Sequence, residues 1–314
     1  MHYVWIGLGI AAFLALAVLA IAYVCFRIAF YAPKRKEANK EEFPLPKGSV
    51  YDPFRDTMIG WMKEVRAMPF EAVSVRSFDG LTLNGKYYEY APGAPIELMF
   101  HGYRGNAERD LCGGIQRCFA LGRSILLVDQ RASEGSDGTV ISFGIHESRD
   151  CHTWIRFMLQ KFGPDVKIIL TGISMGAATV LTAAGKELPP NVIGVLADCG
   201  FTSARDIIQE VIGRMKLPAK IAYPLVRLGA RIFGGFDPDA ASALEAMGHC
   251  RVPVIFFHGE SDDYVPCDMS RRMFEACAAP KKLVTIPGAG HGLSYLVDPD
   301  RYLRELDDFF KPYL

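Results

Sequence analysis

The sequence lacks a surplus of charge of either sign, because 35 lysine and arginine residues are matched by 35 aspartate and glutamate residues. Without a basic excess, the chain offers little to neutralise nucleic-acid phosphates, so we expect no nucleic-acid partner. Half of the residues are hydrophobic, which excludes intrinsic disorder. The 314 residues also show no internal repeat or low-complexity segment, and they predict one large domain or two small ones.

The cysteine pattern lacks the features of a disulfide framework or a zinc ribbon. One of the eight cysteines, Cys25, lies in an apolar run near the amino terminus, which leaves an odd seven at irregular spacing. No C-x-x-C pair occurs, which disfavours a structural zinc site. We therefore expect free thiols, which are typical of a reducing compartment, and neither a metal nor an organic cofactor.

Charge is also missing from one long stretch, since no charged residue occurs from Tyr3 to Phe26. These residues would span roughly 36 Å as a helix, enough to cross a hydrocarbon core of about 30 Å. A signal peptide has a basic start and a shorter apolar core, whereas only His2 and the terminal amine precede this run. We therefore predict a retained transmembrane anchor at residues 3–32.

Basic residues follow the apolar run and predict how it is oriented. The cations lie on its carboxyl side, at Arg27, Lys34, Arg35, Lys36 and Lys40. Because positive flanks tend to stay in the cytoplasm, we expect the rest of the chain to be cytoplasmic and the membrane to be a partner through this helix.

The remaining chain alternates short apolar runs with helical patterns. After a predicted linker at residues 33–50, the pattern indicates βαβ units and a mainly parallel sheet flanked by helices, within one domain at residues 51–314. Two strands around the turn at residues 78–80 predict an antiparallel edge. Residues 201–250 are too long for a simple connection and predict a helical cap insertion, whose apolar residues either line an acyl pocket or pack the cap onto the domain.

The most informative motif is Gly172-Ile173-Ser174-Met175-Gly176, a G-x-S-x-G between a buried strand pattern and a helical pattern. In that context the motif predicts a sharp strand-to-helix turn that exposes the serine hydroxyl. Gly172 and Gly176 would be the small neighbours that this turn requires. We therefore expect Ser174 to be a nucleophile, which needs a base to activate it.

Candidates for that base and for its carboxylate partner lie in two later loops. His291 lies in a glycine-rich loop after the last strand pattern, and it is the best base among seven histidines. The preferred acid is Asp262, with Asp263 second and Asp198 third. The order Ser174, Asp262, His291 is the nucleophile–acid–base order of α/β-hydrolases and differs from the orders of the chymotrypsin and subtilisin types.

A tetrahedral intermediate also needs backbone donors for its oxyanion. The amide of Met175 directly follows the nucleophile and supplies the first expected donor. The second is the amide of Tyr103, in the loop His101-Gly102-Tyr103-Arg104-Gly105-Asn106.

With these residues in view, the chain resembles serine hydrolases of the α/β-hydrolase superfamily, and within it the bacterial esterase/lipase-like members of the Bem46-like and serine-aminopeptidase-like group. The resemblance covers about residues 70–312 and rests on five stretches: residues 101–106, 129–132, 172–176, 258–262 with 265–266, and 290–292. Ala132 stands where many members have glycine. The resemblance implies the α/β-hydrolase fold and places the acid at Asp262, but it implies no particular substrate.

We therefore expect a membrane-anchored serine hydrolase that cleaves carboxylic, lipid-like or acyl esters through an acyl-enzyme, with a small-molecule acyl substrate as its partner. Two alternatives stay open at this stage. One is a peptidase, an aminopeptidase or a thioesterase on the same fold. The other is a non-catalytic binding protein on a hydrolase fold.

Overall fold

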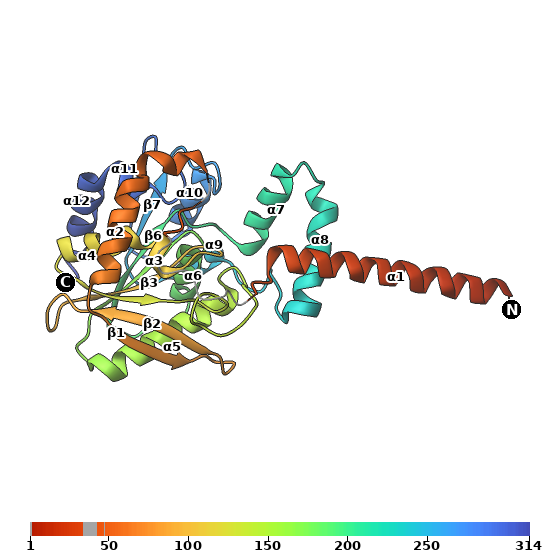
Figure 1. Cartoon of the computed structure of the whole chain (residues 1–314), viewed down its shortest axis with the longest axis horizontal. Helices are drawn as coiled ribbons and strands as arrows, with labels where there is room; N and C mark the ends of the chain where they lie inside the picture. The colour runs from red at the N-terminus through yellow and green to blue at the C-terminus, as the bar shows by residue number, and fades with distance from the viewer. Residues whose placement is uncertain (1, 34–42, 47) are drawn as a thin grey trace.

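An eight-stranded sheet forms the centre of the protein, in a computed structural model that describes residues 2–33, 43–46 and 48–314 (Figure 1). The strand order is β1-β2-β4-β3-β5-β6-β7-β8. The pairs β1–β2 and β2–β4 are antiparallel, and the pairs from β4–β3 to β7–β8 are parallel. The strands are β1 (Glu71–Arg76), β2 (Thr82–Tyr88), β3 (Ile96–Phe100), β4 (Ser124–Val128), β5 (Ile168–Ile173), β6 (Val192–Asp198), β7 (Val254–Gly259) and β8 (Lys281–Ile286).

Helices cover both faces of this sheet, which explains why β3, β4 and β7 are buried at every position. One layer packs its apolar side chains with Phe100, Leu170 and Phe256 and consists of α5 (Ile145–Phe162), α6 (Met175–Ala184), α9 (Ala243–Met247) and α10 (Cys267–Ala276). The other layer consists of η1 (Ser49–Phe54), α2 (Arg55–Ala67), α3 (Ala107–Asp110), α4 (Cys112–Ala120), α11 (Ser294–Val297) and α12 (Pro299–Phe310).

The amino-terminal helix α1 (His2–Ala29) projects away from this body, with its first residue farthest out (Figure 1). It is long and apolar enough to cross a membrane. Its apolar side chains from Tyr3 to Leu16 are exposed, whereas Ala22 and Phe26 are buried against the protein. Three elements lie between β6 and β7 beside this end of the helix: α7 (Ala204–Arg214), α8 (Ala219–Gly229) and the π-helical turn η2 (Ala230–Gly234). Of these, α8 and η2 are in direct contact with α1.

The predicted α/β-hydrolase fold class is confirmed, including the antiparallel edge made by β1 and β2. The edge forms because the turn at Phe78-Asp79-Gly80 returns the chain, with Gly80 at φ +86°. Most of the predicted linker at residues 33–50 lies outside the described residues, and η1 begins within its last part.

Candidate active site

Ser174 lies at the turn between β5 and α6, at the carboxyl edge of the sheet. Its φ of 55° and ψ of −115° are strained for a residue with a side chain. A Cβ on Gly172 would lie 2.2 Å from the carbonyl carbon of Gly176, and one on Gly176 would lie 2.0 Å from the Phe100 carbonyl oxygen. Only glycine fits at these two places, so the local sequence is what allows the turn to present Ser174.

His291 reaches Ser174 from the loop between β8 and α11. Its Nε2 lies 2.9 Å from Ser174 Oγ, and its Nδ1 lies 2.7 Å from Asp262 Oδ2. Since the ionised carboxylate accepts at Nδ1, that nitrogen carries the proton and Nε2 is left to accept from the serine hydroxyl. The Tyr51 hydroxyl donates to the His291 carbonyl oxygen at 2.9 Å and ties this loop to η1.

Asp262 is held in place by several donors besides His291. The amides of Tyr264 and Val265 both donate to Oδ1 at 2.8 Å, and His258 Nε2 lies 3.3 Å from Oδ2. Burial alone would raise the pKa of the Asp262 carboxyl. Hydrogen bonds from His258 and His291 outweigh burial and hold that pKa below its usual range. The carboxylate is therefore charged at neutral pH and able to stabilise a protonated His291.

The two other candidate acids lie elsewhere. Asp198 is buried and accepts hydrogen bonds from the Ser294 and Tyr302 hydroxyls, each at 3.0 Å. Asp263 is exposed and lines the cavity in front of Ser174. The structure thus brings Asp262, and neither of these residues, within hydrogen-bonding distance of His291.

The two segments that carry the expected oxyanion donors both lie next to Ser174. Met175 is the first residue of α6, where amides have no partner inside the helix. A Cβ on Gly102 would lie 3.6 Å from Ser174 Cβ, so the loop that carries Tyr103 passes close to Ser174. The Gly102 amide donates to Asp110 Oδ2 at 3.0 Å, which fixes this loop from α3.

His101 and Gln130 form a second support for the loop, which the sequence analysis missed. The Gln130 amide donates to His101 Nε2 at 3.1 Å, and the Gln130 side chain donates to the His101 carbonyl oxygen at 2.6 Å. His101 Nδ1 therefore carries the proton and donates to the Gly102 carbonyl oxygen at 2.8 Å. Burial lowers the pKa of His101, so the ring stays neutral.

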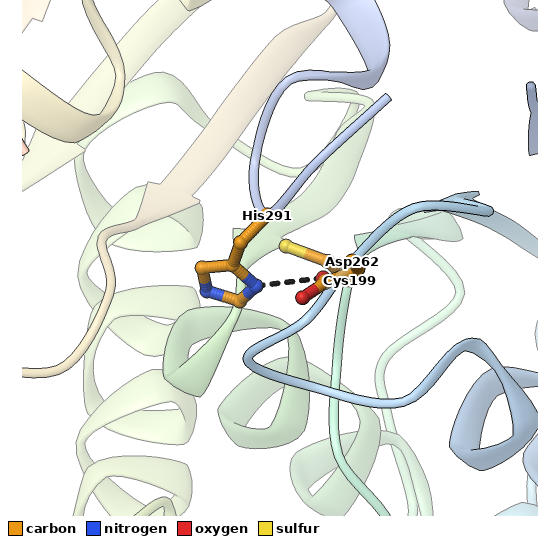
Figure 2. Close-up of side chains that lie close together, drawn as sticks. All are labelled: Cys199, Asp262 and His291. Carbon is orange, nitrogen blue, oxygen red and sulfur yellow. Dashed lines mark hydrogen bonds and ion pairs between the residues drawn. The ribbon is translucent and has the colours of Figure 1, made fainter. Parts of the chain in front are cut away.

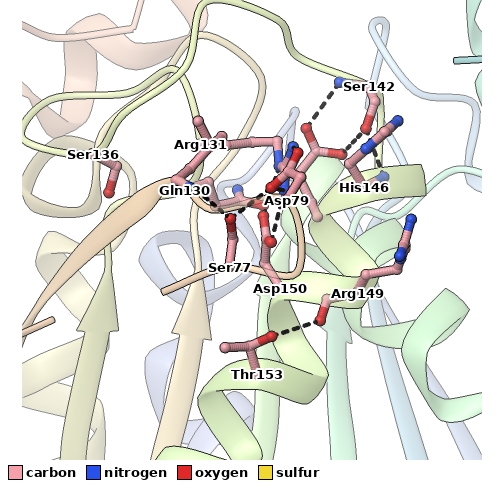
Figure 3. A network of polar contacts seen from close by, with 12 residues as sticks. Ser77, Asp79, Gln130, Arg131, Ser136, Ser142, His146, Arg149, Asp150 and Thr153 are labelled. Atoms are coloured by element: carbon pink, nitrogen blue, oxygen red, sulfur yellow. Dashed lines mark hydrogen bonds and ion pairs between the residues drawn. The ribbon is translucent and has the colours of Figure 1, made fainter. Parts of the chain in front are cut away.

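The segment after β4 that carries Gln130 is fixed in turn by Arg131, shown in Figure 3. Its guanidinium donates to Asp150 on α5 at 2.7 and 2.8 Å and to Asp79 at 2.9 and 3.2 Å. Ala132 follows with φ 60°, in the left-handed region that glycine adopts most easily. Alanine instead of glycine at position 132 therefore strains the backbone of this loop. It does not alter the contacts among Ser174, His291 and Asp262.

A cavity of about 750 Å³ opens in front of Ser174 and His291. Its apolar lining includes Val50, Met58 and Ile173. Its charged lining is of both signs and consists of Arg104, Arg109, Arg214, Asp110 and Asp263, besides His291. A mainly apolar cavity of about 80 Å³ adjoins it and shares Met58, Asp110, Ile173 and Gly292 with it. Among the cap residues, Arg214 lines the large cavity, whereas Ile207, Ile208 and Ile212 are buried in the core beside α1. The apolar face of α7 therefore packs the cap onto the protein.

Cys199, Asp262 and His291 are the described residues that come nearest to a metal site at this edge (Figure 2). Their ligand atoms lie within 4.8 Å of one another. Burial raises the pKa of the Cys199 thiol well above its usual range, which disfavours the thiolate that binds metals. A metal would also displace the hydrogen bond between Asp262 and His291, so the arrangement favours proton transfer.

Comparison with known proteins gives matches over the same part of the chain. Residues 98–305 match the alpha/beta hydrolase family. The uncharacterized protein YqkD of Bacillus subtilis is 27% identical over 190 residues, which are 60% of this chain and 62% of YqkD, slightly less than two thirds of its length. Protein bem46 of Schizosaccharomyces pombe is 25% identical over 250 residues, or 77% of each chain.

Solved structures give the same fold. The esterase Pf2001 of Pyrococcus furiosus superposes with a TM-score of 0.65 and covers 86% of this chain and 97% of its own. Its sequence identity is 18%, so the likeness concerns the fold alone.

Proposed function

Because the chain belongs to the alpha/beta hydrolase family, we propose that it is a membrane-anchored serine hydrolase that cleaves carboxylic esters of lipid-like or acyl type. One observation carries the proposal: Ser174 Oγ, His291 and Asp262 form a continuous hydrogen-bonded chain, with links of 2.9 and 2.7 Å. A nucleophile, a base and a carboxylate that orients the base are the parts that acyl transfer needs.

In the first half of the reaction, Ser174 Oγ attacks the carbonyl carbon of the ester while His291 Nε2 takes the hydroxyl proton. The amides of Tyr103 and Met175 donate to the resulting oxyanion, and Asp262 stabilises the protonated imidazole. Collapse of the intermediate breaks the bond to the alcohol, which leaves with the proton from His291. Ser174 then carries the acyl group as an ester.

In the second half, water replaces the alcohol. His291 accepts a proton from this water, whose oxygen adds to the acyl carbon, and the same two amides hold the oxyanion. The carboxylic acid departs, and the proton on His291 returns to Ser174 Oγ. Each oxyanion donor is typically worth a factor of ~10²–10³ in rate.

The two adjoining cavities support an acyl substrate. The small, mainly apolar cavity shares Ile173 with the larger one and suits the beginning of an acyl chain, while the larger cavity has charged side chains of both signs in its lining. An ester bond placed at Ser174 would thus have apolar surface within reach as well as charged surface.

Burial at the end of α1 argues against removal of the whole segment. Phe26 and Phe30 are buried in one cluster with Tyr223 of α8 and Phe236, so a cut beyond Phe30 would expose apolar surface of the cap. A cut after Ala17 would leave both phenylalanines in place and would remove most of the exposed apolar stretch. The exposed apolar stretch from Tyr3 to Ile21 approaches the roughly 20 residues that a membrane-spanning helix needs.

A substrate panel on the full-length protein in detergent micelles tests this function. The panel contains p-nitrophenyl esters from acetate to palmitate, aminoacyl p-nitroanilides and acyl-coenzyme A thioesters, with Ser174→Ala as the matched control. We expect ester cleavage that needs Ser174 and a kcat/KM that rises with acyl chain length. A preference for the anilides would replace the proposal with an aminopeptidase, and a preference for the thioesters with a thioesterase. A kcat/KM that does not change with acyl chain length would contradict the proposed lipid-like substrate.

A further inference from the structure

The last turns of α1 are built into the protein rather than standing apart from it (Figure 1). A Cβ on Gly229 would lie 2.2 Å from the Ala22 carbonyl oxygen, so α8 and α1 pack backbone to backbone. Phe30 is fully buried, with its ring against those of Phe143 and Phe236. Just beyond the helix, Ala32 donates to the Thr139 carbonyl oxygen at 2.8 Å.

The loop over the nucleophile donates directly to this end of α1. The Tyr103 hydroxyl donates to the Ala29 carbonyl oxygen at 2.7 Å. Arg104 Nη2 donates to the carbonyl oxygens of Ile28 at 2.8 Å and Tyr31 at 3.0 Å. The last carbonyls of a helix have no partners within it and carry partial negative charge, so a guanidinium and a phenol suit them. Burial raises the pKa of Tyr103 to about 12, which keeps the phenol protonated as a donor.

The same two residues shape the oxyanion side of the site. The backbone amide of Tyr103 is the proposed second oxyanion donor, and Gly102 before it lies against Ser174. Arg104 has φ 51°, a left-handed conformation that persists in a residue with a side chain when its surroundings hold it. The contacts of its guanidinium with α1 hold it from one side, and the Gly105 amide, which donates to the Gly102 carbonyl oxygen at 3.2 Å, closes the turn.

We propose that the carboxyl end of α1 is part of the scaffold of the oxyanion hole, and that Arg104 and the Tyr103 phenol are positioning residues that couple the helix to it. The inference rests on the proposed function, because Arg104 and the Tyr103 phenol can position an oxyanion donor only if an oxyanion forms beside Ser174. The helix then does more than hold the enzyme at a membrane, since its end sets the direction of one amide in the site.

The test measures kcat and KM on a water-soluble short-chain ester, with full-length protein in detergent micelles. Arg104→Met keeps the length of the side chain and removes its donors, Arg104→Lys keeps the charge, and Tyr103→Phe removes only the hydroxyl. The matched control is Arg27→Met, because Arg27 also lies at this end of α1 but stacks over Tyr31 at 4.1 Å and bonds to Tyr23. The melting temperature and membrane association of every variant are recorded alongside.

We expect Arg104→Met to lower kcat about tenfold, less than the complete loss of an oxyanion donor, with KM within about twofold of wild type. Arg104→Lys should recover part of the loss, Tyr103→Phe should lower kcat several-fold, and Arg27→Met should match wild type. Wild-type kcat in both Arg104→Met and Tyr103→Phe, with Ser174→Ala inactive, would overturn this inference and leave the function standing. A change confined to KM would also overturn it. Activity retained by Ser174→Ala would instead reject the proposed function.

Discussion

At the scale of single residues, Asp262 accepts from His291 Nδ1 at 2.7 Å, and we propose that it orients His291 as the base. Asp262→Asn presents an amide to His291 Nδ1, which favours the wrong tautomer of the ring, and we expect kcat to fall by about 10³–10⁴. The check is a comparison of kcat and melting temperature with Glu260→Gln, an exposed acid of the same loop that accepts from Thr285 at 2.7 Å. Retained kcat in Asp262→Asn together with loss in Asp263→Asn would move the role of the acid to Asp263.

The residues of the candidate site could be proposed from the sequence where a local pattern marks them. Ser174 has a strand before it, a helix after it and glycines at the two positions where any Cβ would clash, so its sequence neighbourhood describes its surroundings. His101, Asp110 and Tyr51 were not predictable. Their contacts join segments that only the folded sheet edge brings together, such as the Tyr51 hydroxyl and the carbonyl of His291, 240 positions apart.

At the scale of elements, a buried ion cluster joins β3 to α4. Glu97 is fully buried and accepts from Arg117 at 2.6 Å, Arg123 at 2.7 Å and Thr171 at 2.8 Å. Burial would raise the pKa of this carboxyl, but the charges of Arg117 and Arg123 outweigh it and lower the pKa to about 2. Removing the charge leaves two buried guanidinium groups without their counter-ion.

We therefore expect Glu97→Gln to lower the free energy of unfolding at pH 7 by about 3–5 kcal/mol. Since the folded pKa lies below the unfolded value of 4.5, the charge stabilises the protein above pH 4.5, and this stability is lost as the pH falls towards 2. Denaturant titrations at pH 7 and pH 3.5 check both points, because the variant should lose less stability between the two values than wild type does.

Glu71→Gln is the matched control, because Glu71 pairs with Lys161 at the exposed edge strand, where an ion pair contributes about 1 kcal/mol or less. Equal effects of the two substitutions at pH 7 would contradict the account of the buried cluster.

The elements were predictable from period and length, because alternating strands and helices of this kind favour a parallel sheet with covered faces. The packing of α1 was not. A run that is apolar on every side gives no sign that Ala22, Phe26 and Phe30 face protein while the earlier residues are exposed. The sequence also could not show where the apolar face of α7 packs. The same apolar pattern fits the wall of a pocket and the buried core in which this face lies.

At the scale of the whole molecule, we expect an uncleaved chain held in a membrane. The intact mass of the protein purified from membranes should retain residues 1–32, and the protein should stay with membranes after an alkaline carbonate wash, because the exposed apolar stretch of α1 needs hydrocarbon around it. A mature chain that begins after Ala17, released into the soluble fraction, would show that the segment is a signal peptide.

Orientation is a separate prediction at this scale. The cations at and beyond the end of α1, beginning with Arg27 in its last turn, predict that the hydrolase domain lies in the cytoplasm. In intact cells, a carboxyl-terminal tag should therefore resist added protease, and it should become sensitive to the protease only after lysis. Digestion of the tag in intact cells would reverse the orientation.

The central claim is that Ser174 is a nucleophile activated by His291, and labelling with a fluorophosphonate probe tests it most directly. Full-length wild type should react, and peptide mapping should locate the adduct on Ser174. Ser174→Ala and His291→Ala should both fail to react while keeping the wild-type melting temperature. Labelling that persists in Ser174→Ala, or a folded wild type that does not react at all, would contradict the account.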